Sequence, residues 1–373
     1  MSLSRLKSNL FLNLKHLPGP RTKRKILVFE CDDWGSIRMP SEKVYKTLSD
    51  KGFKLNNRYD RFDTLADEED LQELFKVLES EKDKNAHSAV MTPMVNVMNP
   101  DFEKIKASGF RELFFEPFDI TLQKYERSSN TLELWKQGKK KGIFTPEYHG
   151  HSHITTQLWL KRLKTGDPVL LEAFDLGFAH PHVNNIPSVA NGFRPELFFD
   201  HPAQVPFLEN YLKEGIGFFK KIFGFSPIVF APTNGIFHPV FEKPLSEAGI
   251  KYLYVSWLTK TPNGQGGLKK KFYPVGTKGK TGLTYYSRNC AFEPTDKAYD
   301  PGKTMKQIAA AFKWGKPAII STHRVNFVGA ISQKNRERGL AELKKLLSGI
   351  KKQWPEVEFM SSADMLKVLF KNK

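Results

Sequence analysis

The chain alternates between short apolar runs and longer amphipathic stretches from about residue 25 to its end. Runs typical of buried strands occupy residues 26–31, 88–97, 228–231, 252–256, 282–287, 317–321 and 357–360. Helical stretches lie between them, the clearest at 66–79, 207–223 and 335–352. This alternation predicts an α/β fold with a parallel sheet, because each helix returns the chain to the start of the next strand. With seven to eight parallel strands, we expect a distorted or incomplete (β/α) barrel.

One segment interrupts the alternation. Residues 163–206 lack clear periodicity and are rich in His, Pro and Asn, which is typical of a binding surface or lid. No glycine-rich linker divides the rest, so we expect one domain over residues 25–373 with this segment inserted. Residues 1–24 form a basic N-terminal segment that we expect to pack on the barrel. A basic amphipathic helix on an anionic membrane is the alternative for that segment.

Three histidines, His149, His151 and His153, fall within five residues. The i, i+4 spacing predicts that His149 and His153 share one face of a helical turn, about 5–6 Å apart at Cβ. One divalent metal ion can bind both imidazoles at that separation, and His151 should point elsewhere. A histidine-rich surface turn without a ligand is the alternative interpretation of this motif alone.

Asp32 and Asp33 end the first apolar run. Barrel folds place their chemistry at the carboxyl ends of parallel strands. Adjacent residues of an extended segment point to opposite sides, so one carboxylate can bind a metal while the other faces a different part of the site. A turn cap is the alternative. The run at 317–321 ends similarly, near His323, and closure of the sheet would bring Asp32 and His323 to one mouth.

These segments resemble the polysaccharide deacetylases, carbohydrate esterase family four. Asp32-Asp33-Trp34-Gly35 resembles the first motif of that family, and His149-Gly-His-Ser-His153 resembles the second. The ranges 230–235 and 245–257 resemble the third and fourth motifs, and 319–323 resembles the last. The resemblance spans roughly residues 25–365. It implies a barrel of the glycoside hydrolase/deacetylase type.

The resemblance also implies a metal-dependent hydrolase that removes acetyl groups, N-acetyl before O-acetyl, from a polysaccharide or amino-sugar glycan. Asp33, His149 and His153 would bind one divalent metal ion; zinc is the first expectation, and cobalt, nickel or manganese are alternatives. Asp32 would be the catalytic base and His323 the catalytic acid. Further side chains near the motifs are expected to contact the substrate: Trp34, Asn96, Arg194, Asn234, Trp257 and Arg288.

Two positions depart from the family pattern. Ala231 stands where the family has an arginine that orients the base, and Ser256 replaces an acid before the fourth-motif tryptophan. Candidates for the missing arginine, in the order we expect them, are Arg194, Arg38 and Arg288. The departures leave two alternatives open. One is a metal-assisted hydrolase of another carbon–nitrogen or glycosidic bond, and the other is a non-catalytic glycan- or membrane-binding relative.

The amino-acid composition indicates which class of molecule the protein binds. A formal net charge of +18 at pH 7 favours an anionic partner, such as an acidic or lipid-linked carbohydrate or a membrane surface. The lysine runs at 139–141 and 269–271 are typical of solvated faces. No nucleic-acid-binding motif occurs, so we expect no nucleic-acid partner. Two cysteines cannot form a disulfide framework. We expect a cytoplasmic protein, with peripheral contact to the inner face of the membrane as an alternative.

Overall fold

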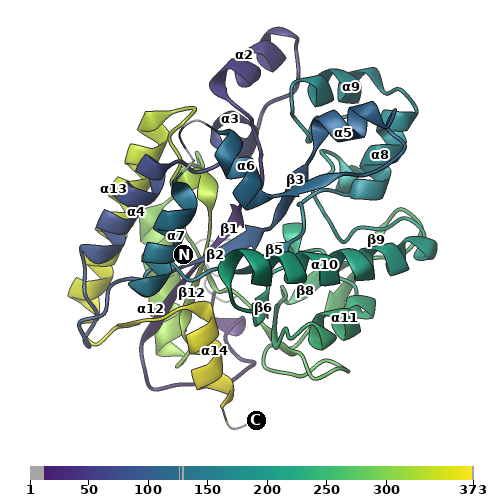
Figure 1. Cartoon of the computed structure of the whole chain (residues 1–373). Coiled ribbons are helices and arrows are strands. Elements are labelled where there is room, and N and C mark those ends of the chain that lie inside the picture. The colour runs from purple at the N-terminus through teal and green to yellow at the C-terminus, as the bar shows by residue number, and fades with distance from the viewer. Residues whose placement is uncertain (1–11, 126, 128–129, 372–373) are drawn as a thin grey trace, which may run out of the picture.

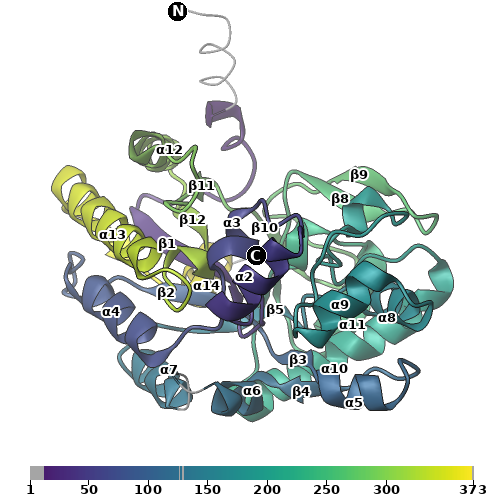
Figure 2. The ribbon, with the colours of Figure 1, turned by 90° about the horizontal axis from the view of Figure 1, so that it is seen from above.

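The computed structural model describes residues 12–125, 127 and 130–371. A nine-stranded sheet forms its centre, and helices surround the sheet (Figures 1 and 2). All strand pairs recorded in this sheet are parallel. Its strands are β1 (Ile26–Trp34), β2 (Met91–Asn96), β5 (Glu147–Gly150), β6 (Val229–Phe230), β7 (Tyr252–Tyr254), β10 (Thr284–Tyr286), β11 (Cys290–Ala291), β12 (Ala318–His323) and β13 (Glu358–Phe359).

The strands follow the order of a distorted barrel. The hydrogen-bonded path runs β10-β7-β6-β5-β2-β1-β12-β11, and β13 pairs with β1 off this path. Each strand on the path therefore neighbours the sheet strand that precedes or follows it in the chain, and β1 also lies beside β12. The two ends of the path, β10 and β11, are successive parts of one chain segment; its first part pairs with β7 and its second part with β12. The predicted distorted (β/α) barrel is thus confirmed.

Helices cover the outside of the sheet, and two antiparallel hairpins extend from it. The hairpins are β3 (Met98–Pro100) with β4 (Phe115–Pro117), and β8 (Leu258–Pro262) with β9 (Leu268–Phe272). The helices are α2 (Glu42–Asp50), α3 (Arg58–Phe62), α4 (Glu68–Glu79), α5 (Phe102–Ala107), α6 (Phe118–Lys124), α7 (Thr131–Lys140), α8 (Thr156–Lys164), α9 (Pro168–Asp175), α10 (Val205–Phe223), α11 (Glu242–Glu247), α12 (Pro301–Lys313), α13 (Gln333–Gln353) and α14 (Ser362–Phe370).

Strand β1 separates two apolar layers. Leu27, Phe29 and Cys31 belong to the large cluster that β1 shares with the surrounding helices, whereas Ile26 and Val28 belong to a smaller cluster of strand residues and α14. Because side chains alternate along a strand, the even-numbered positions of β1 face the barrel interior. Both faces are covered, which explains why this strand is apolar over its first four residues.

Some predicted elements differ from the observed ones. The segment 163–206 is not uniformly irregular, because it contains the end of α8 and all of α9, whose first turn is capped by Asp167. The hairpins β3–β4 and β8–β9 and the sheet strands β5 and β11 were not predicted. Most of the proposed N-terminal amphipathic helix lies outside the described residues. The described part of the N-terminal segment contacts the barrel through Lys316, whose ammonium group donates to the carbonyl oxygens of residues 18–20. Among the described residues, no helix combines the length and hydrophobicity needed to cross a membrane.

Candidate active site

A β-bulge in β1 turns both carboxylates toward the same space. Asp32, like Ile26 and Val28, is an even-numbered position of β1, so its side chain lies on the inner face of the barrel. Asp33 would point outward in a regular strand. However, the register with β2 shifts between Cys31 and Trp34, and Asp33 has a φ of 74°. This irregularity redirects the side chain of Asp33, as bulges beside active sites commonly do.

The histidine motif is a strand end followed by a loop, so the predicted helical turn is wrong. Strand β5 ends at Gly150, and His153 has a φ of 59°, which no α-helix contains. His149 is fixed by its Nδ1, which lies 2.7 Å from the carbonyl oxygen of Ala231. His151 points elsewhere, as expected, and its ring stacks on Tyr211 at 3.6 Å between centroids. The two outer histidines therefore converge through loop geometry instead of helical spacing.

Glu196 holds this loop in place. Its buried carboxylate accepts hydrogen bonds of 2.9 Å from the backbone N–H groups of His151, Ser152 and His153. Gly150 makes the approach of the carboxylate possible, because a Cβ there would lie 2.7 and 2.9 Å from the two Glu196 oxygens. Gly150 also has a φ of 149°, which favours glycine. The loop geometry thus depends on a glycine and a distant glutamate.

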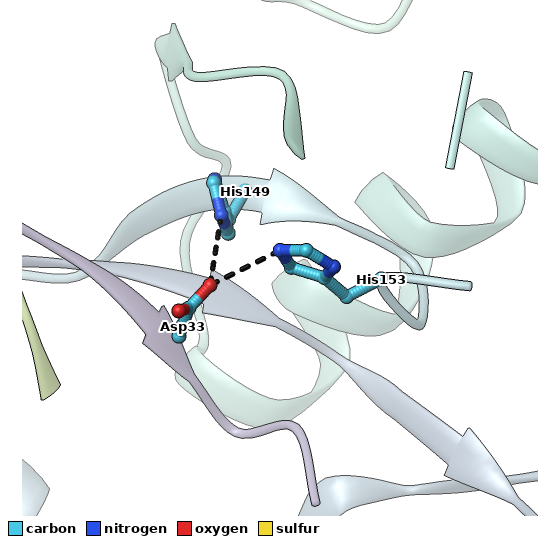
Figure 3. A group of neighbouring side chains, drawn as sticks. All are labelled: Asp33, His149 and His153. Atoms are coloured by element: carbon cyan, nitrogen blue, oxygen red, sulfur yellow. Dashed lines mark ion pairs between the residues drawn. The ribbon is translucent and has the colours of Figure 1, made fainter. Parts of the chain in front are cut away.

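Asp33, His149 and His153 form the only group of potential metal ligands found among the described residues (Figure 3). Their ligand atoms all lie within 4.8 Å of one another, and all three side chains are buried. Asp33 Oδ1 is 3.5 Å from His149 Nε2 and 3.1 Å from His153 Nε2. Two imidazoles and one carboxylate are a donor set that zinc accepts, with a fourth position left open.

Arg38 contacts the same ligand atoms. Its Nη2 lies 3.0 Å from Asp33 Oδ1 and 3.0 Å from His153 Nε2. Burial opposes ionisation of Asp33, but Arg38 and the two histidines outweigh it and hold the pKa of Asp33 well below its usual value. Burial, followed by the charge of Arg38, lowers the pKa of His153 to about 4. Asp33 is therefore ionised and His153 neutral at pH 7, which are the forms that bind a metal. The residues fit a divalent ion, provided that the guanidinium withdraws from these two atoms.

Asp32 is held by Arg288. The guanidinium donates two hydrogen bonds to the carboxylate, of 2.6 and 2.7 Å, and its Nε donates to Glu30 at 2.5 Å. Burial would raise the pKa of Asp32, but the ion pair with Arg288 outweighs burial and lowers the pKa. Among the three arginines considered, Arg288 is the one that orients Asp32, so the expected order was wrong. Arg194 instead pairs with Asp60 at 2.5 Å.

His323 lies opposite Asp32 in the β1–β12 ladder, as the closure of the sheet predicted. The two side chains approach to 3.9 Å between His323 Nε2 and Asp32 Oδ2. The other ring nitrogen, Nδ1, lies 2.6 Å from Glu293 Oε1. Burial favours neutral imidazole, but the Glu293 charge and hydrogen bond prevail and raise the pKa of His323 to about 9. His323 is therefore protonated at neutral pH.

One polar cavity of about 320 Å³ is lined by all five predicted metal-binding and catalytic residues, Asp32, Asp33, His149, His153 and His323. Of the residues predicted to contact substrate, Arg194, Asn234 and Arg288 line this cavity. Trp257 lines a neighbouring cavity that shares Arg288 with it. Trp34 is buried against Trp135 and Phe144, outside the cavity lining.

Asn96 is also completely buried and does not line the cavity. Two residues that the sequence did not single out, Glu196 and Glu293, hold the histidine loop and His323 in place. Neither lies in a recognisable motif. The only sequence signal for Glu293 is its position after the short apolar segment 290–292, at the same sheet edge as the other site residues.

The chain is similar in fold to several solved carbohydrate-active proteins. A protein of Parabacteroides distasonis, described as a glycoside hydrolase/deacetylase, is 9% identical with a TM-score of 0.47; the match covers 94% of this chain and 74% of that protein. A protein of Mycobacterium smegmatis, described as a polysaccharide deacetylase, is 10% identical with a TM-score of 0.44, over 94% and 93% of the two chains.

The 4-alpha-glucanotransferase of Thermococcus litoralis is 13% identical with a TM-score of 0.45. This match covers 92% of the present chain but only 40% of the glucanotransferase. No protein-family profile and no curated protein sequence matches the chain. At these identities and TM-scores, the solved structures do not assign a function to this chain.

Proposed function

We propose that the protein is a metal-dependent hydrolase that removes acetyl groups from a glycan, with N-acetyl groups as the preferred substrate. The observation that supports this most directly is the placement of three groups in one cavity: a candidate metal triad, an ionised carboxylate and a protonated imidazole. A metal ion, a proton acceptor and a proton donor can together hydrolyse an acyl group.

Asp33, His149 and His153 would hold the divalent ion, zinc in the first instance. When bound, such an ion supplies Lewis acidity that polarises an acyl carbonyl and activates water. Asp32, fixed by Arg288, is ionised at neutral pH and accepts the proton of the attacking water. His323, protonated through Glu293, donates a proton to the departing atom of the substrate.

The acid favours an amide over an ester. An amine leaves an acyl group only after its nitrogen is protonated, whereas an alcohol depends less on a strong proton donor. The pKa of about 9 keeps His323 protonated throughout the neutral range. Removal of an N-acetyl group therefore suits this acid better than removal of an O-acetyl group.

We further propose a binding role for the segment 163–206 within a single barrel domain. This segment supplies Arg194 to the cavity lining and Glu196 to the histidine loop. Cys31 and Cys290 are buried and unpaired with each other, which supports a reducing compartment such as the cytoplasm.

The metal content of the purified protein and acetate release from N-acetylglucosamine oligomers test the proposal together. We expect about one metal ion per wild-type chain, and loss of both metal and acetate release in His149→Ala. His87→Ala is the matched control, because this histidine is 70% exposed and lies outside the site. Metal binding without acetate release from any acetylated glycan would overturn the assigned reaction, and no metal after reconstitution would overturn the metal dependence.

A further inference from the structure

The hairpin β8–β9 forms part of the wall of the catalytic cavity. Leu258 and Lys260 of β8 line the same cavity as Asp32 and His323. The rest of β8 is anchored, since Thr259 and Thr261 are buried. The hairpin therefore presents one strand face to the substrate space and fixes the other to the protein.

Cross-strand pairing extends this face onto β9. Leu258 lies opposite Phe272, and Lys260 lies opposite Lys270. Directly opposed residues of an antiparallel ladder have their side chains on the same side of the sheet. Phe272 and Lys270 thus share the face of Leu258 and Lys260. The result is one apolar pair and one cationic pair beside the cavity.

Both pairs are open to solvent in the described part of the protein, although the Phe272 ring contacts Trp257 at 6.2 Å between centroids. Leu258 and Phe272 are 56% and 55% exposed. No carboxylate of the described residues forms a recorded ion pair with Lys260 or Lys270, and both lysines are exposed. Like charges directly opposite each other destabilise a ladder. An anion bound between the two ammonium groups would remove this repulsion.

We propose that Lys260 and Lys270 bind an acidic group of the glycan substrate, and that Leu258 and Phe272 pack against the adjoining sugar ring. The acidic group is a carboxylate or a phosphate on a residue next to the acetylated sugar. This inference rests on the proposed function and adds to it the class of substrate: an anionic acetylated glycan in place of a neutral one. The lysine run at 269–271 is then a binding element on one face and not merely a solvated surface.

The opposite face of the same hairpin supplies a matched control. Lys269 and Lys271 pair with the buried Thr261 and Thr259, so they lie on the other side of the ladder. The ammonium group of Lys271 also lies 5.3 Å from the ring centroid of Tyr273. The double variants Lys260→Gln/Lys270→Gln and Lys269→Gln/Lys271→Gln remove the same charge from different faces.

The test measures equilibrium binding of two oligosaccharides of equal length at low salt. One is a hyaluronan hexasaccharide, in which N-acetylglucosamine alternates with glucuronate, and the other is a neutral N-acetylglucosamine hexamer. We expect wild-type protein to bind the anionic hexasaccharide about tenfold more tightly or better. Lys260→Gln/Lys270→Gln should abolish this preference, and Lys269→Gln/Lys271→Gln should retain it. Equal loss in both variants would show an effect of overall charge and would overturn the proposal.

Competition identifies the acidic group. Displacement of the hexasaccharide by N-acetylglucosamine 6-phosphate in preference to glucuronate would assign a phosphate, and the reverse would assign a carboxylate. Displacement by neither would overturn the proposal. Acetate release from the same samples separates the deacetylase function from the anion site. A lysine-dependent preference for the anionic hexasaccharide without acetate release would refute only the deacetylase function. Acetate release without that preference would refute only the anion site.

Discussion

The positively charged guanidinium group of Arg38 lies 3.0 Å from two of the three candidate ligand atoms, Asp33 Oδ1 and His153 Nε2. A dication bound there would experience repulsion from the guanidinium, which must withdraw before the ion can enter. We predict that Arg38→Gln binds zinc roughly tenfold more tightly than wild type, about 1.4 kcal/mol, as measured by competition with a chromophoric chelator. Arg194→Gln is the control, because Arg194 lines the same cavity but pairs with Asp60. Weaker binding in Arg38→Gln alone would instead assign Arg38 a supporting role.

Glu293 sets the protonation of His323. The pKa of His323 is raised above its ordinary value to about 9. The imidazole is therefore protonated at neutral pH and loses its proton as the pH rises through 9. We predict that Glu293→Gln moves the alkaline limb of the pH–rate profile down by roughly one to two pH units. Asp296→Asn should leave the limb in place, since Asp296 pairs with Arg58 and makes no recorded contact with His323. An unchanged limb in Glu293→Gln would remove His323 from the role of acid.

The residues that line the candidate site could largely be predicted from the sequence, whereas the residues that hold them in place could not. Asp32, Asp33 and the two outer histidines stand in motifs of fixed spacing, and the structure brings them together with His323. The supporting groups are ion-pair partners from distant parts of the chain. Arg288, for example, binds a carboxylate 256 positions away, and no local pattern in the sequence encodes that pairing.

At the scale of elements, seven of the nine sheet strands were predicted, because a buried strand in a parallel sheet is a continuous apolar run. The strands β5 and β11 are short and were not predicted. The turn after β5 was not predicted either, because His149 and His153 have the spacing of a helix but the backbone leaves the strand at Gly150 with positive φ. The i, i+4 spacing of the two histidines favours a helical turn, but hydrogen bonds from the loop to the distant Glu196 hold the backbone in another conformation.

Gly150→Ala tests this dependence. The added Cβ would meet the Glu196 carboxylate at 2.7 Å in a backbone region that favours glycine. We predict a loss of about 2–3 kcal/mol in the free energy of unfolding, measured by urea denaturation, and a weakened affinity for zinc. Gly217→Ala is the control, because Gly217 lies in α10 and no described atom beyond the adjacent residues and the nearby backbone of this helix lies within 4 Å of the place that an added methyl group would take. That change should stabilise the protein by about 0.5–1 kcal/mol. Unchanged stability in Gly150→Ala would show that the loop holds without Glu196.

At the scale of the whole molecule, an interruption of the strand pairing serves the site. The segment that closes the sheet pairs first with β7, through β10, and then with β12, through β11. Arg288 lies at the junction of β10 and β11, residues 287–289, and reaches inward to Asp32 and Glu30. The junction therefore places an arginine beside Asp32.

The N-terminal segment lies against the junction of β10 and β11, and Lys316 attaches it. A cavity of about 340 Å³ lies between residues 15–20 and residues 287–291. The ammonium group of Lys316 donates to three backbone carbonyls of that segment at 2.6–2.9 Å. Removal of this donor leaves the three carbonyl oxygens without its hydrogen bonds. The segment should then separate from the barrel more readily.

We predict that Lys316→Ala lowers the free energy of unfolding by about 2 kcal/mol and increases hydrogen exchange in residues 287–291 more than in β1. Lys313→Ala, at the end of α12, is the control and should change neither quantity. Because Arg288 lies within residues 287–291 and orients Asp32, kcat for acetate release should fall together with the stability of these residues. A destabilised Lys316→Ala protein with unchanged exchange at residues 287–291 would show that the N-terminal segment does not protect these residues.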